Sequence, residues 1–145
     1  MVLLTGKLKL VLDTNAWLDW LVFDDPCMAP VREAVAAGRA AIFIDEACAA
    51  ELERVLARPF GRRSLDAAGQ AAAMAAARGF SVLIEKKWEG KGLPACRDPD
   101  DQKFLEAAAA AQADMLITKD AALLELARRK PPFRILLPQE FSLAP

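Results

Sequence analysis

Two acidic residues follow apolar runs that are typical of buried strands. Asp13 comes directly after Leu8–Leu12, and Asp120 comes shortly after Met115–Thr118. Ligands of an open parallel sheet bind beyond the carboxyl ends of its strands, so both carboxylates are expected at that edge. Aspartate is also a good N-cap, so each residue could instead begin the helix that follows it.

Two further acids are placed by helical periodicity. Asp101 precedes Phe104 and Leu105 by three and four residues, which puts it on the apolar face of its predicted helix. Glu51 lies at the border of another apolar stripe, about 60° from the centre of that stripe. The alternatives are a first-turn acid that complements the helix dipole for Asp101, and an ordinary boundary residue for Glu51.

The four acids together point to a bound ion. Four carboxylates in one cleft would repel one another and raise their pKa values unless a divalent cation neutralised them. Mg²⁺ or Mn²⁺ prefers such oxygen ligands, and it can bind a phosphate oxygen and activate water near neutral pH. This chemistry needs no histidine, and the sequence contains none.

The absence of histidine excludes several classes of site. Ser-His-Asp and Cys-His catalysis, imidazole general bases and zinc sites with a histidine ligand are all ruled out. The three cysteines are widely spaced and form no C-x-x-C motif. Neither a disulfide framework nor a cysteine-only metal site is therefore expected.

The composition describes a globular chain without an overall basic field. Its 145 residues are 54% hydrophobic and 27% charged, with a net charge of −1. No apolar run approaches a membrane span, and lysines interrupt the apolar N-terminus, so we expect a cytoplasmic protein without membrane contact. Three basic clusters are most simply solvated faces or helix ends: Arg58 with Arg62 and Arg63, Lys86 with Lys87 and Lys91, and Arg128 with Arg129 and Lys130.

The elements that must position these residues alternate between strand and helix. Strands are predicted at residues 8–12, 40–44, 80–84, 115–118 and 134–137. Helices are predicted at about 16–23, 30–38, 45–58, 64–79, 98–111 and 121–129, with a loop at 85–97. The strands lack polar alternation, which favours an α/β fold with a parallel sheet covered on both faces. We expect one domain over residues 1–145, with residues 1–7 as a short extension.

Four segments carry a family resemblance. They are Leu10–Asn15 (LVLDTN), Glu51–Leu56 (ELERVL) followed by Arg58-Pro59, Asp98–Ala107 (DPDDQKFLEA), and Ala113–Asp120 (ADMLITKD) followed by Leu123-Leu124. In order and spacing they resemble the PIN domain family, and within it the subgroup of toxin components from toxin–antitoxin systems. The resemblance extends from the first predicted strand to the fourth.

The resemblance implies a three-layer α/β/α sandwich with a five-stranded parallel sheet of order 3-2-1-4-5. The family's acidic quartet corresponds to Asp13, Glu51, Asp101 and Asp120, which would hold one or two Mg²⁺ or Mn²⁺ ions. Asp98 is a candidate fifth acid. Asn15 and Thr118 match polar residues that order the first and last acids.

The implied activity is metal-dependent hydrolysis of phosphodiester bonds in single-stranded RNA. Such a type II toxin would have a cognate antitoxin as partner, and family members often form homodimers. A non-catalytic PIN module that binds RNA or protein is the alternative, although such degenerate domains usually lose acids. A phosphoaspartate enzyme is disfavoured because Asn15 stands where a second acid would be needed.

Three residues near the quartet have open interpretations. Trp17 and Trp20 replace the smaller aliphatic residues that are more usual in the family. They either pack in the core or stack an RNA base beside the cleft. Lys119 precedes Asp120, where it could contact phosphate or face solvent.

Overall fold

A five-stranded parallel sheet forms the centre of the computed structural model, which describes residues 7–85, 87, 88, 90 and 92–143. The strands are β1 (Leu8–Leu12), β2 (Ala40–Asp45), β3 (Ser81–Ile84), β4 (Met115–Ile117) and β5 (Arg134–Leu136). Their order is β3-β2-β1-β4-β5, which confirms the predicted topology. Residues 1–6 of the expected N-terminal extension, and Lys86 and Lys91 of the second basic cluster, lie outside the described residues.

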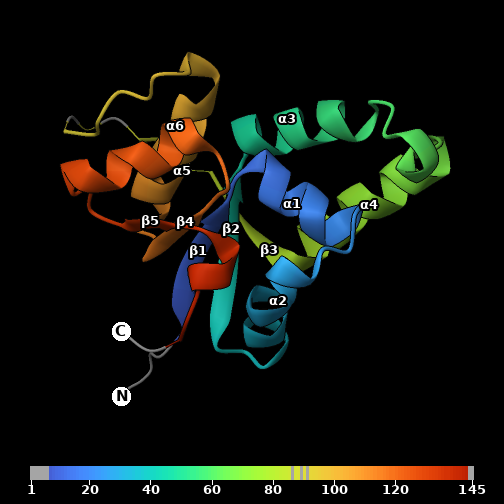
Figure 1. Ribbon diagram of the computed structural model, residues 1–145, viewed down its shortest axis with the longest axis horizontal. Coiled ribbons are helices and arrows are strands. Elements are labelled where there is room, and N and C mark those ends of the chain that lie inside the picture. The colour runs from blue at the N-terminus through green and yellow to red at the C-terminus, as the bar shows by residue number, and fades with distance from the viewer. Residues whose placement is uncertain (1–6, 86, 89, 91, 144–145) are drawn as a thin grey trace.

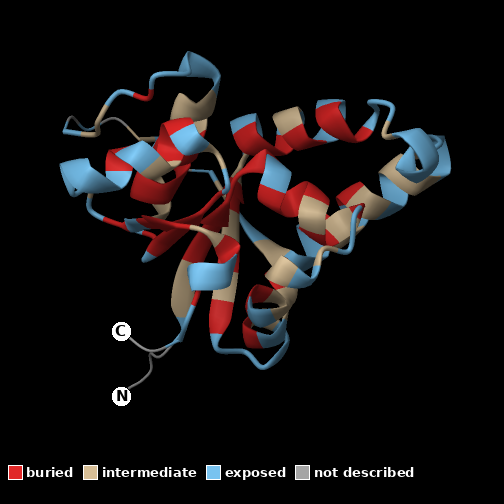
Figure 2. Ribbon diagram, in the orientation of Figure 1, coloured by how far each residue is buried: buried red, intermediate tan, exposed pale blue. Residues whose placement is uncertain are grey.

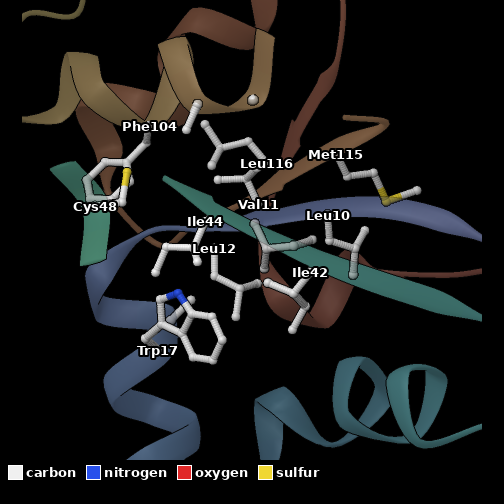
Figure 3. Packing of buried hydrophobic residues seen from close by; sticks show 14 of the residues in the cluster. Leu10, Val11, Leu12, Trp17, Ile42, Ile44, Cys48, Phe104, Met115 and Leu116 are labelled. Carbon is white, nitrogen blue, oxygen red and sulfur yellow. The ribbon is translucent and has the colours of Figure 1, made fainter. Parts of the chain in front are cut away.

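Helices cover both faces of this sheet. They are α1 (Thr14–Leu21), α2 (Ala29–Ala36), α3 (Glu46–Leu56), α4 (Ala67–Phe80), α5 (Gln102–Ala111) and α6 (Ala121–Leu124). Figure 3 shows α5, which carries Phe104, on one side of the sheet, and α1, which carries Trp17, on the other. In Figure 1, α3 and α4 extend together away from the strands. The predicted α/β/α layering is therefore present.

Leu10–Leu12 of β1 and all of β4 are buried on both faces of the sheet, which explains the apolar sequence of these segments. Leu10, Val11 and Leu12 are at most 1% exposed, although alternate residues of a strand point to opposite faces. Figure 2 shows these strands in the buried colour, with helices packed around them. This rigid centre fixes the positions of the residues that follow β1 and β4.

Both tryptophans near the predicted cleft belong to the core. Trp17 is 1% exposed and Trp20 is 9% exposed, and their ring centroids lie 5.8 Å apart. Trp20 also contacts Phe80, with a centroid distance of 4.9 Å. Because neither indole is accessible, the interpretation of these residues as a base-stacking platform is wrong.

The observed helix boundaries differ from the predicted ones where a side chain accepts a hydrogen bond from a backbone N–H. The fourth helix begins at Ala67 rather than at Ser64, because Asp66 accepts a hydrogen bond from the Gly69 N–H. Ser64 accepts from the Phe60 N–H instead and closes a short 3₁₀ turn. The last predicted helix is α-helical only to Leu124 and continues as a 3₁₀ helix to Arg129.

No helix among the described residues is both long and apolar enough to cross a bilayer. The longest, α4, has 14 residues, whereas a transmembrane helix needs about 20.

Candidate active site

A small acidic cleft lies at the carboxyl ends of β1 and β4, the two strands from which the chain winds in opposite directions across the sheet. Leu12 pairs with Ile117 at this edge, and the Asp13 N–H donates to the Ile117 carbonyl at 3.2 Å. Such a switch point is where open α/β sheets bind ligands. The cleft has a volume of about 140 Å³ and is lined by Asp13, Thr14, Asn15, Glu51, Val55, Arg58, Asp101, Phe104 and Asp120.

All four predicted acids therefore line one cleft. They arrive from different parts of the chain, namely the end of β1, the middle of α3, the turn before α5 and the start of α6. Asn15 lies on the rim as an exposed residue. Asp98 is not among the lining residues. Its carboxylate caps the 3₁₀ turn Pro99–Asp101 by accepting from the Asp100 N–H at 3.0 Å.

Asp13 is the most deeply buried acid of the cleft. It is 3% exposed, and its two carboxylate oxygens accept hydrogen bonds from the Ala16 N–H at 2.8 Å and the Thr118 hydroxyl at 2.5 Å. Burial raises the pKa of Asp13 to about 6, although both hydrogen bonds act in the opposite direction. The carboxylate thus caps α1 and lines the cleft at the same time.

Thr118 connects the first and the last acid of the quartet. Its hydroxyl donates to Asp13 and accepts from the Asp120 N–H at 2.9 Å. The residue is completely buried, so both bonds are shielded from water. Asp120 in turn accepts from the Ala122 N–H at 2.8 Å and begins α6. One hydroxyl group therefore sets the orientation of two acidic residues.

Replacing Thr118 by valine is expected to lower the free energy of unfolding by about 1–3 kcal/mol. The substitution keeps the shape of the side chain but leaves Oδ2 of the buried Asp13 carboxylate and the Asp120 N–H each without a hydrogen-bond partner. Urea unfolding at pH 7 measures the change. Thr118→Ser keeps the hydroxyl and is the matched control. A valine variant as stable as the wild type would show that this hydroxyl is dispensable.

The carboxyl groups of Asp101 and Asp120 influence each other, and their pKa values shift in opposite directions. Burial raises the pKa of Asp101 to about 8, and the neighbouring Asp120, Asp98 and Asp13 add to the effect. The pKa of Asp120 is held below its usual range because the protonated Asp101 donates to it. The Oδ2 atom of Asp101 is buried and receives no hydrogen bond from any described donor. A carboxylate oxygen in this position needs either a proton or a cation.

Glu51 is held by two residues that sequence reasoning did not identify. The Lys103 ammonium lies 2.5 Å from its Oε1, and the Thr14 hydroxyl donates to its Oε2. Burial acts to raise the pKa of Glu51, but these two bonds, together with the positive charges of Lys103 and Arg54, hold the pKa below its usual range. Lys103 comes two residues after Asp101, and Thr14 directly follows Asp13. Their proximity in sequence to two quartet acids is the only signal that could have found them.

Removing the Lys103 ammonium is expected to destabilise the protein at neutral pH. Both side chains of the pair are mostly buried, with 23% and 17% exposed, so Lys103→Met should cost about 1–3 kcal/mol. Because the pKa of Glu51 is lowered in the folded protein, its ionised side chain stabilises the fold at pH values above the ordinary glutamate pKa. This stabilisation is lost as the pH falls through the folded pKa. The decrease in melting temperature caused by Lys103→Met should therefore become smaller below about pH 4.

The matched control for that variant is Arg97→Met, which breaks an ion pair of similar type on the surface. Arg97 contacts Glu125 at 3.0 Å, and the two side chains are 66% and 46% exposed. Its loss should leave the melting temperature unchanged. An equal effect of both substitutions would mean that burial of the Lys103–Glu51 pair has no energetic consequence.

A second group of possible metal ligands lies outside the cleft. Within the described ranges, three ligand atoms that are all within 4.8 Å of one another occur only at Asp19, Asp25 and Cys27. The Lys119 ammonium already occupies this place, at 2.7 Å from Asp19 and 3.4 Å from Asp25. Burial also raises the pKa of the Cys27 thiol, which keeps it protonated. Lys119 is therefore a counter-ion of Asp19 and Asp25, and the residue is exposed to solvent.

No three of the four acids in the cleft bring ligand atoms within 4.8 Å of one another. This spacing agrees with a hard cation that keeps several water molecules, since Mg²⁺ commonly uses only one or two protein carboxylates. The all-oxygen donor set and the unpartnered Asp101 Oδ2 fit such an ion.

Comparison with known proteins identifies the class. Residues 9–122 match the PIN domain family. The chain therefore belongs to the PIN domain family. No curated protein matches the sequence.

Eight chains of solved structures are similar to this one. One of them belongs to the crystal structure of VapBC2 from Rickettsia felis bound to a DNA fragment from their promoter. It aligns with a TM-score of 0.59 and 13% identity, over 88% of this chain and 97% of the other. At that identity the likeness concerns the fold.

Proposed function

We propose that this protein is a metal-dependent ribonuclease that hydrolyses phosphodiester bonds of single-stranded RNA. The observation that carries the proposal is the buried Asp101 Oδ2, which has no donor, in a cleft lined by three further carboxylates. Four carboxylates in one cleft repel one another, and a divalent cation would relieve that repulsion. Membership of the PIN domain family supports the same activity.

Asp13, Asp101, Asp120 and Glu51 are the residues that would hold Mg²⁺ or Mn²⁺. When bound, the ion would neutralise the acids, polarise a phosphate oxygen and lower the pKa of the attacking water. Thr118 holds Asp13 and Asp120 in fixed orientations. Lys103 and Thr14 do the same for Glu51, so the donor groups are arranged before any ligand enters.

Cleavage of a panel of single-stranded RNAs in EDTA, Mg²⁺ or Mn²⁺ tests the activity, and calorimetry measures ion binding separately. Cleavage that requires the ion would support the ribonuclease. Ion binding and cleavage that are both absent would instead support a non-catalytic PIN module that binds RNA or protein.

We further propose that the protein is the toxin of a type II toxin–antitoxin system and acts in the cytoplasm as a homodimer. The similar chain from the VapBC2 crystal structure supports a protein partner. An antitoxin segment that carries a basic residue would fit among the four acids of the cleft. Growth arrest on expression, relieved by a protein encoded beside it, tests the toxin role, and light scattering tests the dimer.

A further inference from the structure

Arg58 is the one cationic residue that lines the acidic cleft among the described residues. It lies two residues beyond the end of α3, and two residues of that helix, Glu51 and Val55, line the same cleft. In Figure 1, α3 runs from the edge of the sheet outward, and Arg58 follows the C-terminal end of that helix in the chain. The residue is exposed.

No carboxylate neutralises this arginine. Within the part of the chain that the structure describes, Arg58 has no ion pair, although four acids line the same cleft. The two lysines nearest the quartet in sequence are already paired, Lys103 with Glu51 and Lys119 with Asp19. The guanidinium therefore keeps its five donors available for a ligand.

The backbone that carries Arg58 is held on both sides. Its N–H donates to the Val55 carbonyl at 3.0 Å, which closes a turn after the end of α3, and Pro59, whose φ is fixed by its ring, follows it directly. Phe60 then packs edge-on against Phe23, with ring centroids 5.4 Å apart. The arginine is thus presented from a fixed position at the border of the cleft, which reduces the entropy cost of binding.

A nucleic acid that enters this cleft meets four carboxylates, and its own phosphates are also negative. A bound ion offsets part of this repulsion at the scissile phosphate, but neighbouring phosphates need another cation. Arginine suits this task because its planar guanidinium can bind two phosphate oxygens at once. The position of Arg58 beside the acids, and its lack of a partner, match that requirement.

We propose that Arg58 binds a phosphate of the single-stranded RNA next to the scissile one and so directs the strand along α3. This inference rests on the proposed ribonuclease function. It makes Arg58 a substrate-binding residue rather than a catalytic one. Its loss should therefore raise KM for RNA cleavage more than it lowers kcat.

The test measures binding of a labelled single-stranded RNA at several salt concentrations, in an Asp120→Asn background that prevents cleavage. Arg58→Met should weaken binding about tenfold, as expected for one charge-assisted contact. It should also reduce the slope of log K against log salt by about 0.7, the value for one phosphate contact on a single strand. Arg58→Lys keeps the charge and should restore most of the slope.

Arg39→Met is the matched control. Arg39 is also an exposed arginine without an ion pair among the described residues. It precedes β2, at the amino end of the sheet and opposite to the cleft. Its replacement should leave both the affinity and the salt slope unchanged.

Three outcomes would overturn the inference in distinguishable ways. Equal effects of the Arg58 and Arg39 substitutions on RNA binding would contradict the proposed phosphate contact, but they would not contradict the ribonuclease proposal. Tighter Mg²⁺ binding by Arg58→Met with an unchanged RNA slope would make Arg58 a counter-ion of the acids. If the wild-type protein neither binds nor cleaves RNA, the proposed function fails together with the contact.

Discussion

Replacing Asp120 by asparagine is expected to reduce metal-dependent RNA cleavage by at least about 100-fold, because a carboxylate that helps to hold the ion is lost. The fold should persist. Asp120 accepts a hydrogen bond from the Ala122 N–H and so begins α6, and asparagine caps helices as well as aspartate does. The substitution also removes a negative charge beside Asp101. The melting temperature should therefore stay equal or rise.

Asp66→Asn is the matched control for that experiment. Asp66 caps α4 by accepting from the Gly69 N–H, is exposed, and does not line the cleft. Rates are compared in Mg²⁺ and in EDTA, and melting temperatures are recorded for both variants. If the Asp120→Asn variant still cleaves RNA at a tenth of the wild-type rate or faster, the Asp120 carboxylate is not needed to hold the proposed ion. A large loss of activity in Asp66→Asn would point to an indirect effect.

Helix capping and cleft formation are not competing roles for the aspartates. The sequence left open whether Asp13 and Asp120 begin helices or form a site, and each carboxylate does both. A carboxylate has two oxygens, and capping uses one of them. Helix N-termini also stabilise negative charge. The same local signal that favours a cap therefore brings charge to the carboxyl edge of the sheet.

The convergence of the four acids could be predicted because it depends on local patterns, whereas the strand order was implied by the resemblance to the PIN domain family. Apolar runs without alternation mark β1 and β4, and the acids follow them or lie on helix faces beside them. Lys103 and Thr14 could not be found in this way. Glu51 is separated from Lys103 by 52 residues, and only the packing of α3 on α5 brings them together.

The accessibility of single side chains was equally beyond sequence reasoning. Trp17 and Trp20 could have been surface aromatic residues, and they are buried because α1 turns that face toward the sheet and α4. Arg58 belonged to one of three similar basic clusters. Among the described residues of these three clusters, only Arg58 lines the acidic cleft, and the fold alone shows this position.

The metal-free protein is expected to lose stability as pH rises from about 5 to 8. Burial raises the pKa of Asp101 to about 8 in the folded chain, against an ordinary value of 3.8. Between those values the folded state holds a proton that the unfolded chain has released, so the free energy of unfolding falls with increasing pH. Asp13, with a pKa of about 6, acts in the same direction up to that pH. Asp120 and Glu51 have lowered pKa values, so their opposite contributions change only below this window.

Asp101→Asn should flatten this pH dependence, because asparagine resembles the protonated acid at every pH. In EDTA at pH 8 the variant should melt about 2–4 °C above the wild type, which corresponds to roughly 1 kcal/mol once solvent screening is allowed for. Mg²⁺ should stabilise the wild type more at pH 8 than at pH 6, because protons compete with the ion for Asp101. The exposed neighbour Asp100 supplies the control, Asp100→Asn. A wild-type melting temperature that rises with pH in EDTA would mean that Asp101 is already ionised in the folded protein, and the argument for a cation at its unpartnered oxygen would lose its basis.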